Sequence, residues 1–365
     1  MLVVAPRIGV LVAAIALLTS ANGTENRTLT AVPGIRVGHH TLAERPTGCT
    51  VIVPEHGAVA GVDVRGWAPG TRETALLAPV NSNQQIHAIV LSGGSAFGLD
   101  AASGVMRYLD EHNVGLKLGA NGAINVPIVP GAVLIDLWVG GKPQIRPTAD
   151  CGYEAARAAT TEAVVEGNVG AGAGATVGKF AGRDRAMKGG LGSAAITLPN
   201  GIVIAALVAV NAFGDVIDPA TGKVIAGVRT PDGAGLADAR TLLRSGWTRA
   251  TTPAKSGGGG GAGAGEGENT TLGVIATNAR LTKAAATKVA QMAHDGYARA
   301  IAPIHTPVDG DTIFALATGD LPGDVPNDEV GRIGALAADV MAEAIVRAVR
   351  QATSLPGIPA ARDLR

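Results

Sequence analysis

In the stretch KSGGGGGAGAGEGENTTLGVIATN, residues 255–278, a glycine-rich tract ends at Asn269 and an apolar segment begins. Glycine runs have the most conformational entropy to lose and no side chains to pack, so a mobile surface loop is expected over residues 257–267. Residues 272–277, LGVIAT, are apolar and rich in β-formers, which predicts a buried strand. A hydroxyl residue at the start of such a strand, behind a cleavable loop, suits a self-cleaving hydrolase. A plain linker between two domains explains the composition equally well.

The composition of the whole chain predicts a layered α/β protein. Of 365 residues, 47% are hydrophobic and 3% aromatic, so the core must consist of Ala, Val, Leu and Ile, with 52 glycines allowing close backbone approach. Thirty basic and thirty acidic residues give a formal net charge of zero. This balance removes the electrostatic argument for a nucleic-acid or anionic-membrane partner. We expect a small-molecule substrate.

The N-terminus has the features of an export signal. Arg7 precedes an apolar run from Ile8 to Leu18 and small residues near Ala21. The run is shorter than the roughly 20 apolar residues that span a bilayer, but it is typical of a secretory signal. We therefore expect residues 1–21 to be a signal peptide and the protein to be periplasmic or secreted. The alternative is a wrongly assigned start codon and a cytoplasmic protein that begins near Thr28.

Cysteine and histidine usage gives no metal site. Cys49 and Cys151 are the only cysteines, and neither lies in a CxxC motif or next to a histidine at ligand spacing. In an exported protein they could pair, and two buried free thiols are the alternative. The seven histidines form no i,i+4 pair on a predicted helix, so we expect packing or surface roles and neither a metal nor another cofactor.

Local patterns predict alternating strands and helices. Strands are expected at 34–40, 49–53, 59–64, 86–91, 193–198, 202–210, 272–277 and 313–317, and helices at 99–111, 151–165, 236–243, 282–300 and 333–351. The turn between the strand at 86–91 and the following helix contains Gly93, Gly94 and Ser95. Their N–H groups could hold a carbonyl oxygen or an anion. Tight packing is the alternative explanation of this turn.

A second glycine tract, GNVGAGAGATVGK at residues 167–179, suggests a phosphate-binding loop but lacks its pattern. Such a loop needs a glycine five residues before Gly178 and Ser or Thr after Lys179, whereas this chain has Ala173 and Phe180. We therefore do not expect a nucleotide site there.

The residues that could carry chemistry point to a nucleophile without a histidine base. The free α-amine of an N-terminal threonine can activate its own hydroxyl, since its unperturbed pKa is about 7.7 to 8.0 and burial lowers it. Cleavage between Asn269 and Thr270 would create that amine. Asp309 and Asp311 stand two residues apart at the mouth of a strand, so their side chains can point the same way and hold an ammonium group. A solvated acidic turn is the alternative for this pair.

Several strings, in order, resemble one self-processing family over nearly everything from about Thr28 to the C-terminus. They are VPGIRVGH, LSGGSAFGL, GAGATVGK, ALVAVNAFGDVIDP, GENTTLGVIATNARL and HTPVDGDTIFALATG. The family holds the DmpA-type aminopeptidases and the 6-aminohexanoate-oligomer (nylon) hydrolases. The resemblance implies a four-layer α/β/β/α sandwich of the N-terminal-nucleophile type. It also implies a precursor that cuts itself, and a homo-oligomer, a tetramer of αβ units.

The resemblance also assigns roles to particular residues. Asn269 precedes the scissile bond and Thr270 becomes the nucleophile, which divides the chain into an α chain, residues 22–269 with a flexible tail at 255–269, and a β chain, residues 270–365. Lys179 matches a catalytic lysine, and Asn211 matches an asparagine near the oxyanion. Asp309 and Asp311 match the carboxylate pair of the nylon hydrolases. Ile135 stands where many members have an active-site tyrosine.

Together these patterns predict an autoproteolytically activated N-terminal-threonine amide hydrolase that acts through an acyl-enzyme and needs no cofactor. Its partners would be a small peptide or amide substrate and the α and β chains of its own precursor. Two alternatives stay open at this point: an acyltransferase of the self-cleaving threonine type, and a non-catalytic exported binding module.

Overall fold

The computed structural model describes residues 26–247, 269–323 and 325–364. The predicted signal peptide at 1–21 and the glycine-rich tract up to Glu268 lie outside these ranges. Within the described residues, no helix combines the length and apolar character that a membrane span requires.

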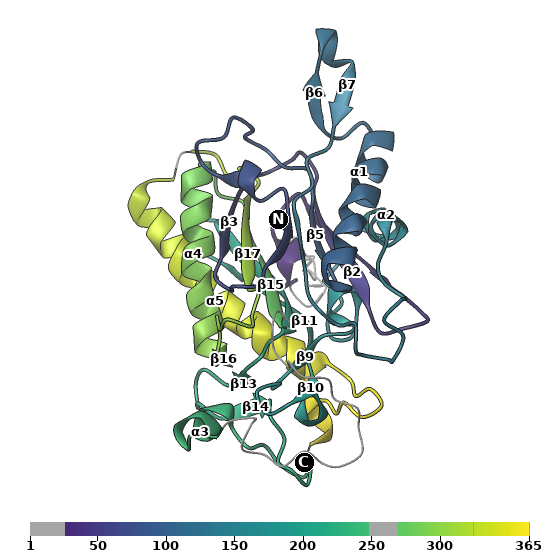
Figure 1. Ribbon diagram of the computed structural model, residues 1–365. Coiled ribbons are helices and arrows are strands. Elements are labelled where there is room, and N and C mark those ends of the chain that lie inside the picture. The colour runs from purple at the N-terminus through teal and green to yellow at the C-terminus, as the bar shows by residue number, and fades with distance from the viewer. Residues whose placement is uncertain (1–25, 248–268, 324, 365) are drawn as a thin grey trace, which may run out of the picture.

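Two five-stranded sheets stack between two pairs of helices (Figure 1). The first sheet has the order β1 (Ile35–Thr41), β2 (Gly48–Pro54), β5 (Ile89–Ser92), β8 (Gly131–Val133) and β4 (Gly70–Arg72). The second has the order β11 (Gly190–Thr197), β12 (Val203–Asn211), β15 (Thr270–Thr277), β17 (Thr312–Ala317) and β3 (Val59–Val64). Helices α1 (Ala101–Glu111) and α2 (Ala149–Arg157) cover the first sheet, and α4 (Lys283–Ala300) and α5 (Asn327–Gln351) cover the second. The predicted α/β/β/α layer order is confirmed.

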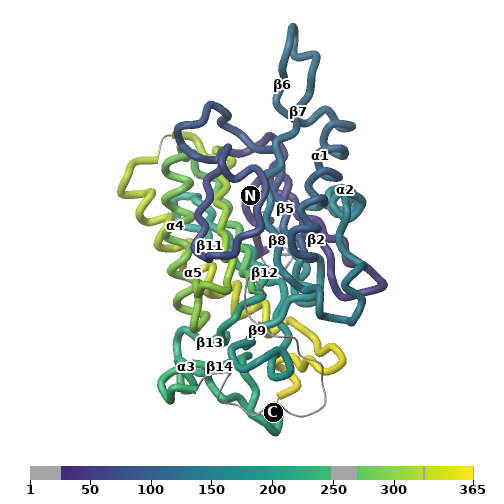
Figure 2. The backbone as a smooth tube through the Cα atoms, viewed as in Figure 1, coloured from purple at the N-terminus to yellow at the C-terminus, as the bar shows by residue number. Residues whose placement is uncertain are grey.

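Smaller elements extend this sandwich at its two ends (Figure 2). A hairpin of β6 (Leu116–Leu118) and β7 (Ile124–Val126) projects from the end that carries α1. At the opposite end lie the pair β9 (Thr176–Val177) and β10 (Met187–Lys188), helix α3 (Ala239–Arg244), and a small sheet of β13 (Asp215–Ile217), β14 (Val224–Ala226) and β16 (Ile301–Ala302) (Figure 1).

Strand β12 shows why the sequence folds into stacked sheets. Its even-numbered residues Ile204, Ala206 and Val208 pack toward α4 and α5, whereas Ala205, Leu207 and Ala209 pack between the two sheets. A strand buried on both faces needs a continuous apolar run, and the run at 202–210 is such a segment. The strands predicted at 193–198 and 202–210 are confirmed, and the β11–β12 register pairs them as an antiparallel hairpin.

Strand β15 occupies the centre of the second sheet. It pairs antiparallel with β12 and parallel with β17. Leu272 and Val274 pack between the sheets, and Ile275 packs toward α4 and α5. At Gly273 a Cβ atom would lie 2.6 Å from the Tyr297 hydroxyl, so only glycine allows α4 to come this close. The strand predicted from LGVIAT is therefore a core strand whose first residue is Thr270.

One predicted helix is too long. The alanine-rich segment 151–165 was expected to be helical throughout, but α2 ends at Arg157. The N–H of Thr160 donates to the carbonyl of Val37, and the N–H of Val37 donates back to Thr160. The chain leaves the helix because these residues add to the edge of the first sheet, a tertiary contact that helix propensity does not register.

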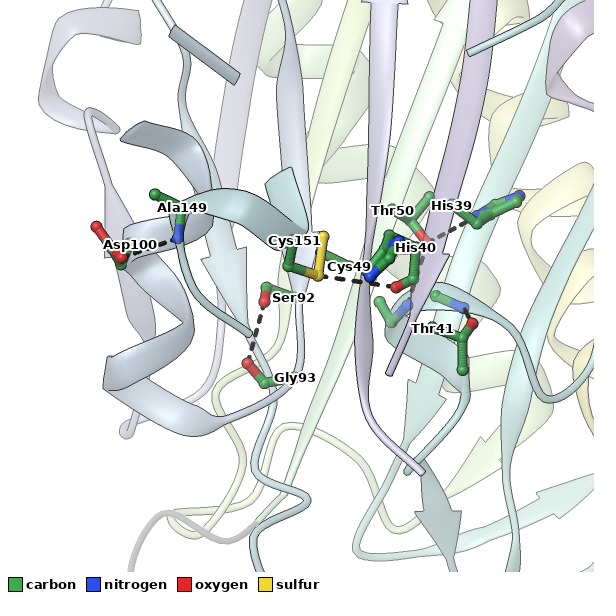
Figure 3. Close-up of a disulfide and its surroundings, with 12 residues drawn as sticks. His39, His40, Thr41, Cys49, Thr50, Ser92, Gly93, Asp100, Ala149 and Cys151 are labelled. Atoms are coloured by element: carbon green, nitrogen blue, oxygen red, sulfur yellow. Dashed lines mark hydrogen bonds between the residues drawn. A yellow bond between two sulfur atoms is a disulfide. The ribbon is translucent and has the colours of Figure 1, made fainter. Parts of the chain in front are cut away.

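Cys49 and Cys151 form a disulfide, which decides between the two alternatives (Figure 3). Cys49 lies in β2 and Cys151 in α2, and both are buried. The bond therefore ties the first sheet to the helix layer that covers it.

We predict that loss of this disulfide destabilises the folded protein. The two cysteines are 102 residues apart, so the bond closes a long loop in the unfolded chain. Replacing Cys151 by Ser should lower the free energy of unfolding by about 2–4 kcal/mol, measured by urea denaturation. Wild-type protein in reductant should show the same loss, and the variant should be insensitive to reductant. Equal stability with and without reductant would contradict the prediction.

Candidate active site

Asn269 and Thr270 lie at the entry to the central strand and are 1% and 2% exposed. Thr270 is opposite Asn211 in the β12–β15 register. In the intact chain the Thr270 hydroxyl donates to the Asn269 carbonyl oxygen at 2.5 Å. The N–H of Gly310 donates to the same oxygen at 2.9 Å. The carbonyl before Thr270 therefore has two donors, one of which is the predicted nucleophile.

The segment Val308–Gly310 fixes the position of Asn269. The backbone N–H of Asn269 donates to the carbonyl of Val308 at 3.3 Å, and its side-chain amide donates to the same carbonyl at 3.2 Å. A parallel bridge joins Asn269 to Asp309. Asn269 Oδ1 is buried and has no hydrogen-bond partner among the described residues. These contacts continue the β15–β17 register upstream of its first pair, Leu272 with Thr312.

Gly310 is a site residue that the sequence analysis did not single out. A Cβ atom there would lie 2.4 Å from the Ala68 carbonyl oxygen and 2.7 Å from Thr270 Oγ1. A side chain would therefore displace the Thr270 hydroxyl or the neighbouring backbone. The string Asp-Gly-Asp gave only a turn signal, because this close approach depends on residues far away in the sequence.

The Asp309 and Asp311 carboxyl groups are both fully buried, so the alternative of a solvated acidic turn is wrong. Asp311 Oδ1 accepts the N–H of Thr271 at 2.8 Å. Asp309 accepts the N–H of Thr306 at 3.0 Å and that of Phe213 at 3.4 Å. Burial, with the charge of Asp311 as the second cause, raises the pKa of Asp309 to about 6. This carboxyl group can therefore take up or release a proton close to neutral pH.

His305 is another site residue that the sequence did not reveal. The histidines were expected to have packing or surface roles. The Nδ1 atom of His305 lies 2.9 Å from Asp311 Oδ2, and its backbone N–H donates to the same oxygen at 3.2 Å. The histidine therefore contacts the carboxylate that holds the start of β15. No local signal marked it, because the i,i+4 test looks for metal pairs on a helix.

Lys179 and Asn211 form a buried cluster at the end of β12. Lys179 Nζ donates to Asn211 Oδ1 at 2.9 Å and to the Asn211 carbonyl at 3.1 Å. It also donates to the carbonyl and hydroxyl oxygens of Thr176, at 3.0 and 3.2 Å. Asn211 Nδ2 donates to the carbonyl of Ile135 at 3.2 Å. Ile135, which stands where a tyrosine was expected, thus orients the Asn211 side-chain amide through its own backbone carbonyl.

A buried lysine supports the loop that carries Lys179. Lys188 Nζ donates to the carbonyls of Gly172, Ala175 and Gly189 at 2.8, 2.9 and 3.1 Å. Burial lowers its pKa to about 7. Lys188 thus holds the second glycine tract by the carbonyl oxygens of the tract. A phosphate site would instead use the N–H groups of the tract.

The turn of Gly93, Gly94 and Ser95 uses its N–H groups inside the fold. Gly93 donates to the carbonyl of Gly48 at 2.9 Å, and Ser95 donates to that of Leu134 at 2.9 Å. Gly94 donates to Asp136 Oδ1 at 2.9 Å. A role of this turn toward substrate stays a prediction. Among the described residues, no group of three or more His, Cys, Asp and Glu side chains could hold a metal ion.

Comparisons with known proteins agree on one family. The model of Peptidase family S58 matches residues 27–362. An uncharacterized aminopeptidase of Mycobacterium tuberculosis is 44% identical over 361 residues, covering 92% of this chain and 97% of the relative. A 6-aminohexanoate-oligomer endohydrolase of Kocuria sp. is 32% identical over 335 residues, covering 87% of this chain and 84% of the relative.

Two solved structures share the fold. A Burkholderia sp. beta-aminopeptidase superposes with a TM-score of 0.65 at 23% identity, covering 90% of this chain and 88% of that chain. The L-aminopeptidase D-Ala-esterase/amidase from Ochrobactrum anthropi, described as a variant of the Ntn hydrolase fold, gives 0.64 at 18% identity, covering 91% and 89%.

The family matches define a hydrolase that acts on amide bonds, and its fold is shared with a structure described as a variant of the Ntn hydrolase fold. The chain belongs to Peptidase family S58. This assignment sets aside the non-catalytic binding module, since the protein is a hydrolase that acts on amide bonds.

The raised pKa of Asp309 predicts a pH-dependent contribution to stability. The pKa of Asp309 in the folded protein, about 6, lies above the ordinary value of 3.8 for an aspartate. The stabilising contribution is therefore present below pH 4 and is lost as the pH rises through 6. We expect Asp309→Asn to remove this loss, which amounts to at most about 1.4 kcal/mol per pH unit.

The measurement compares urea unfolding at pH 4 to 7 for Thr270→Ala protein with and without Asp309→Asn, so that both samples are single chains if Thr270 is the cleaving residue. Asp215, whose pKa burial also raises to about 6, remains in both proteins and cancels in the difference. Parallel stability curves would show that Asp309 does not titrate in this range.

Proposed function

We propose that Thr270 is the nucleophile and that the chain cleaves itself between Asn269 and Thr270. The observation that carries this proposal is the pair of donors on the Asn269 carbonyl oxygen: the Thr270 hydroxyl at 2.5 Å and the Gly310 N–H at 2.9 Å. A scissile carbonyl that is already polarised, next to a buried hydroxyl, is the arrangement that intramolecular attack requires.

Self-cleavage would proceed through an ester. Thr270 Oγ1 loses its proton and bonds to the carbonyl carbon of Asn269, and the negative oxygen that forms faces the Gly310 N–H. The C–N bond breaks as the proton lost from Oγ1 is delivered to the amide nitrogen of Thr270, which leaves the acyl group on Oγ1. Water then hydrolyses the ester, giving a carboxylate on Asn269 and a free amine on Thr270.

The mature site would use the same groups on an external amide. The new α-amine of Thr270 or the Lys179 amine takes the hydroxyl proton, and Asp309 and Asp311 orient the cationic group. Asn211 lies opposite Thr270, and its side-chain amide would stabilise the oxyanion of the tetrahedral intermediate. An acyl-enzyme forms, the amine product leaves, and water releases the acid. An amine in place of this water would give acyl transfer instead.

We propose a peptide with a free N-terminus as the first substrate class to test, because the relatives at 44% identity are named aminopeptidases. The relatives at 32% are named 6-aminohexanoate-oligomer endohydrolases, so an aliphatic amide oligomer is the second class. Amino-acyl p-nitroanilides and an aminohexanoate oligomer, assayed side by side, separate the two.

We predict that wild-type protein separates into two fragments and that the smaller one begins with Thr270. Thr270→Ala should remain a single chain, because the methyl group offers no nucleophile, while Thr270→Ser should still be cut. Intact-mass analysis and N-terminal sequencing measure this directly. Cleavage of the Thr270→Ala protein at the same bond would refute self-cleavage by this residue.

We also predict that Lys179→Met lowers kcat for amide hydrolysis by about a hundredfold, because a positioned proton-transfer group contributes about that much. Lys223→Met, at an exposed lysine, is the matched control and should retain wild-type kcat. Wild-type turnover in cleaved Lys179→Met protein would instead assign the proton transfer to the Thr270 amine alone.

A further inference from the structure

His305 connects the active-site carboxylates to a helix on the outside of the sandwich. The Asp311 carboxylate bridges two partners: Oδ2 accepts from the ring Nδ1 and the backbone N–H of His305, and Oδ1 accepts from the N–H of Thr271. The residue that directly follows Thr270 is thus tied to His305 through one carboxylate. The His305 side chain is 20% exposed, whereas that of Asp311 is fully buried.

Helix α4 supports the ring from behind. The centroid of the His294 ring lies 4.8 Å from that of His305 at an interplanar angle of 70°, and the Tyr297 ring lies 6.0 Å away. The Tyr297 hydroxyl also donates to the carbonyl of Thr271 at 3.2 Å. Both backbone groups of Thr271 are therefore held, the N–H through Asp311 and His305 and the carbonyl by α4 directly.

The hydrogen-bond pattern of the ring favours a proton on Nδ1. That proton satisfies the contact with Asp311, while Nε2 is buried and has no partner among the described residues. A second proton on Nε2 would lack an acceptor there. The His305 ring therefore donates one hydrogen bond, from Nδ1 to Asp311.

The backbone at His305 is itself unusual. Its φ is +57°, in the left-handed region that non-glycine residues seldom adopt. This conformation turns both the backbone N–H and the ring toward the same carboxylate oxygen. A residue at position 305 therefore has to tolerate a positive φ and also supply a side-chain donor to Asp311.

We propose that His305 is a positioning residue for the nucleophile: through Asp311 it fixes the N–H of Thr271, and with it Thr270, against the loop whose Gly310 N–H holds the scissile carbonyl. The inference rests on the proposed role of Thr270. His305 touches none of the reacting atoms, so its removal should slow the reaction without changing the bond that is cut.

The experiment separates the ring donor from the backbone conformation. His305→Gly accepts a positive φ but has no side-chain donor, whereas His305→Asn tolerates the left-handed region and offers an amide N–H near the position of Nδ1. Each protein is made by cell-free translation, synthesis is stopped, and precursor loss is followed on gels. We expect His305→Gly to cleave about tenfold or more slowly than wild type, and His305→Asn to return to within about threefold of it.

The matched control is His294→Phe, which keeps an aromatic ring against His305 and removes no contact with Asp311. It should cleave at the wild-type rate, and thermal melting of purified protein checks that every variant folds. Wild-type cleavage by His305→Gly, or cleavage by His305→Asn as slow as that of the glycine variant, would overturn the proposal.

A second measurement does not require cleavage. In Thr270→Ala protein, His305→Gly should speed hydrogen exchange of the Thr271 amide by about tenfold, and His305→Asn should restore protection. Unchanged exchange refutes the role of His305 even if the chain proves not to cleave itself. An uncut wild-type chain with the expected exchange refutes only the proposed function of Thr270.

Discussion

The parallel pairing between β15 and β17 is the constraint on which both the fold and the site depend. Its register runs from Leu272 opposite Thr312 to Thr277 opposite Ala317, and the bridge between Asn269 and Asp309 continues it upstream. A slip by one residue would turn Leu272 and Val274 away from the space between the sheets. The same slip would move the Asn269 carbonyl away from Gly310. Core packing therefore fixes the geometry of the carbonyl that Thr270 contacts.

Two-sided burial explains why the site lies in the middle of a sheet. Each neighbour of β15 brings a different chemistry to Thr270: β12 places Asn211 opposite it, and the loop before β17 supplies Gly310 and the carboxyl groups. Such burial is costly for charged groups, as the raised pKa of Asp309 shows. Backbone N–H groups from Thr271, Phe213, Thr306 and His305 offset part of that cost.

Sequence reasoning worked where the signal is local. The strand predicted at 202–210 is encoded by a short apolar run, and the helix predicted at 282–300 begins where the Thr282 side chain accepts the N–H of Ala285. Gly310, His305 and Lys188 could not be found this way. Their roles depend on Ala68, Asp311 and the carbonyls of the glycine tract, which approach them only in the folded chain.

The geometry of the uncut chain also bears on how the mature site would take its substrate. While the bond is intact, the Gly310 N–H is occupied by the Asn269 carbonyl. After the proposed cleavage, Asn269 can move away from Gly310. The buried Gly310 N–H would then have no acceptor, which is costly. A substrate carbonyl placed next to Thr270 Oγ1 would restore that hydrogen bond in the position from which the first acyl group departed. In this view the chain's own peptide bond is the first amide held by the site, and the contacts that hold Asn269 define where later acyl groups bind.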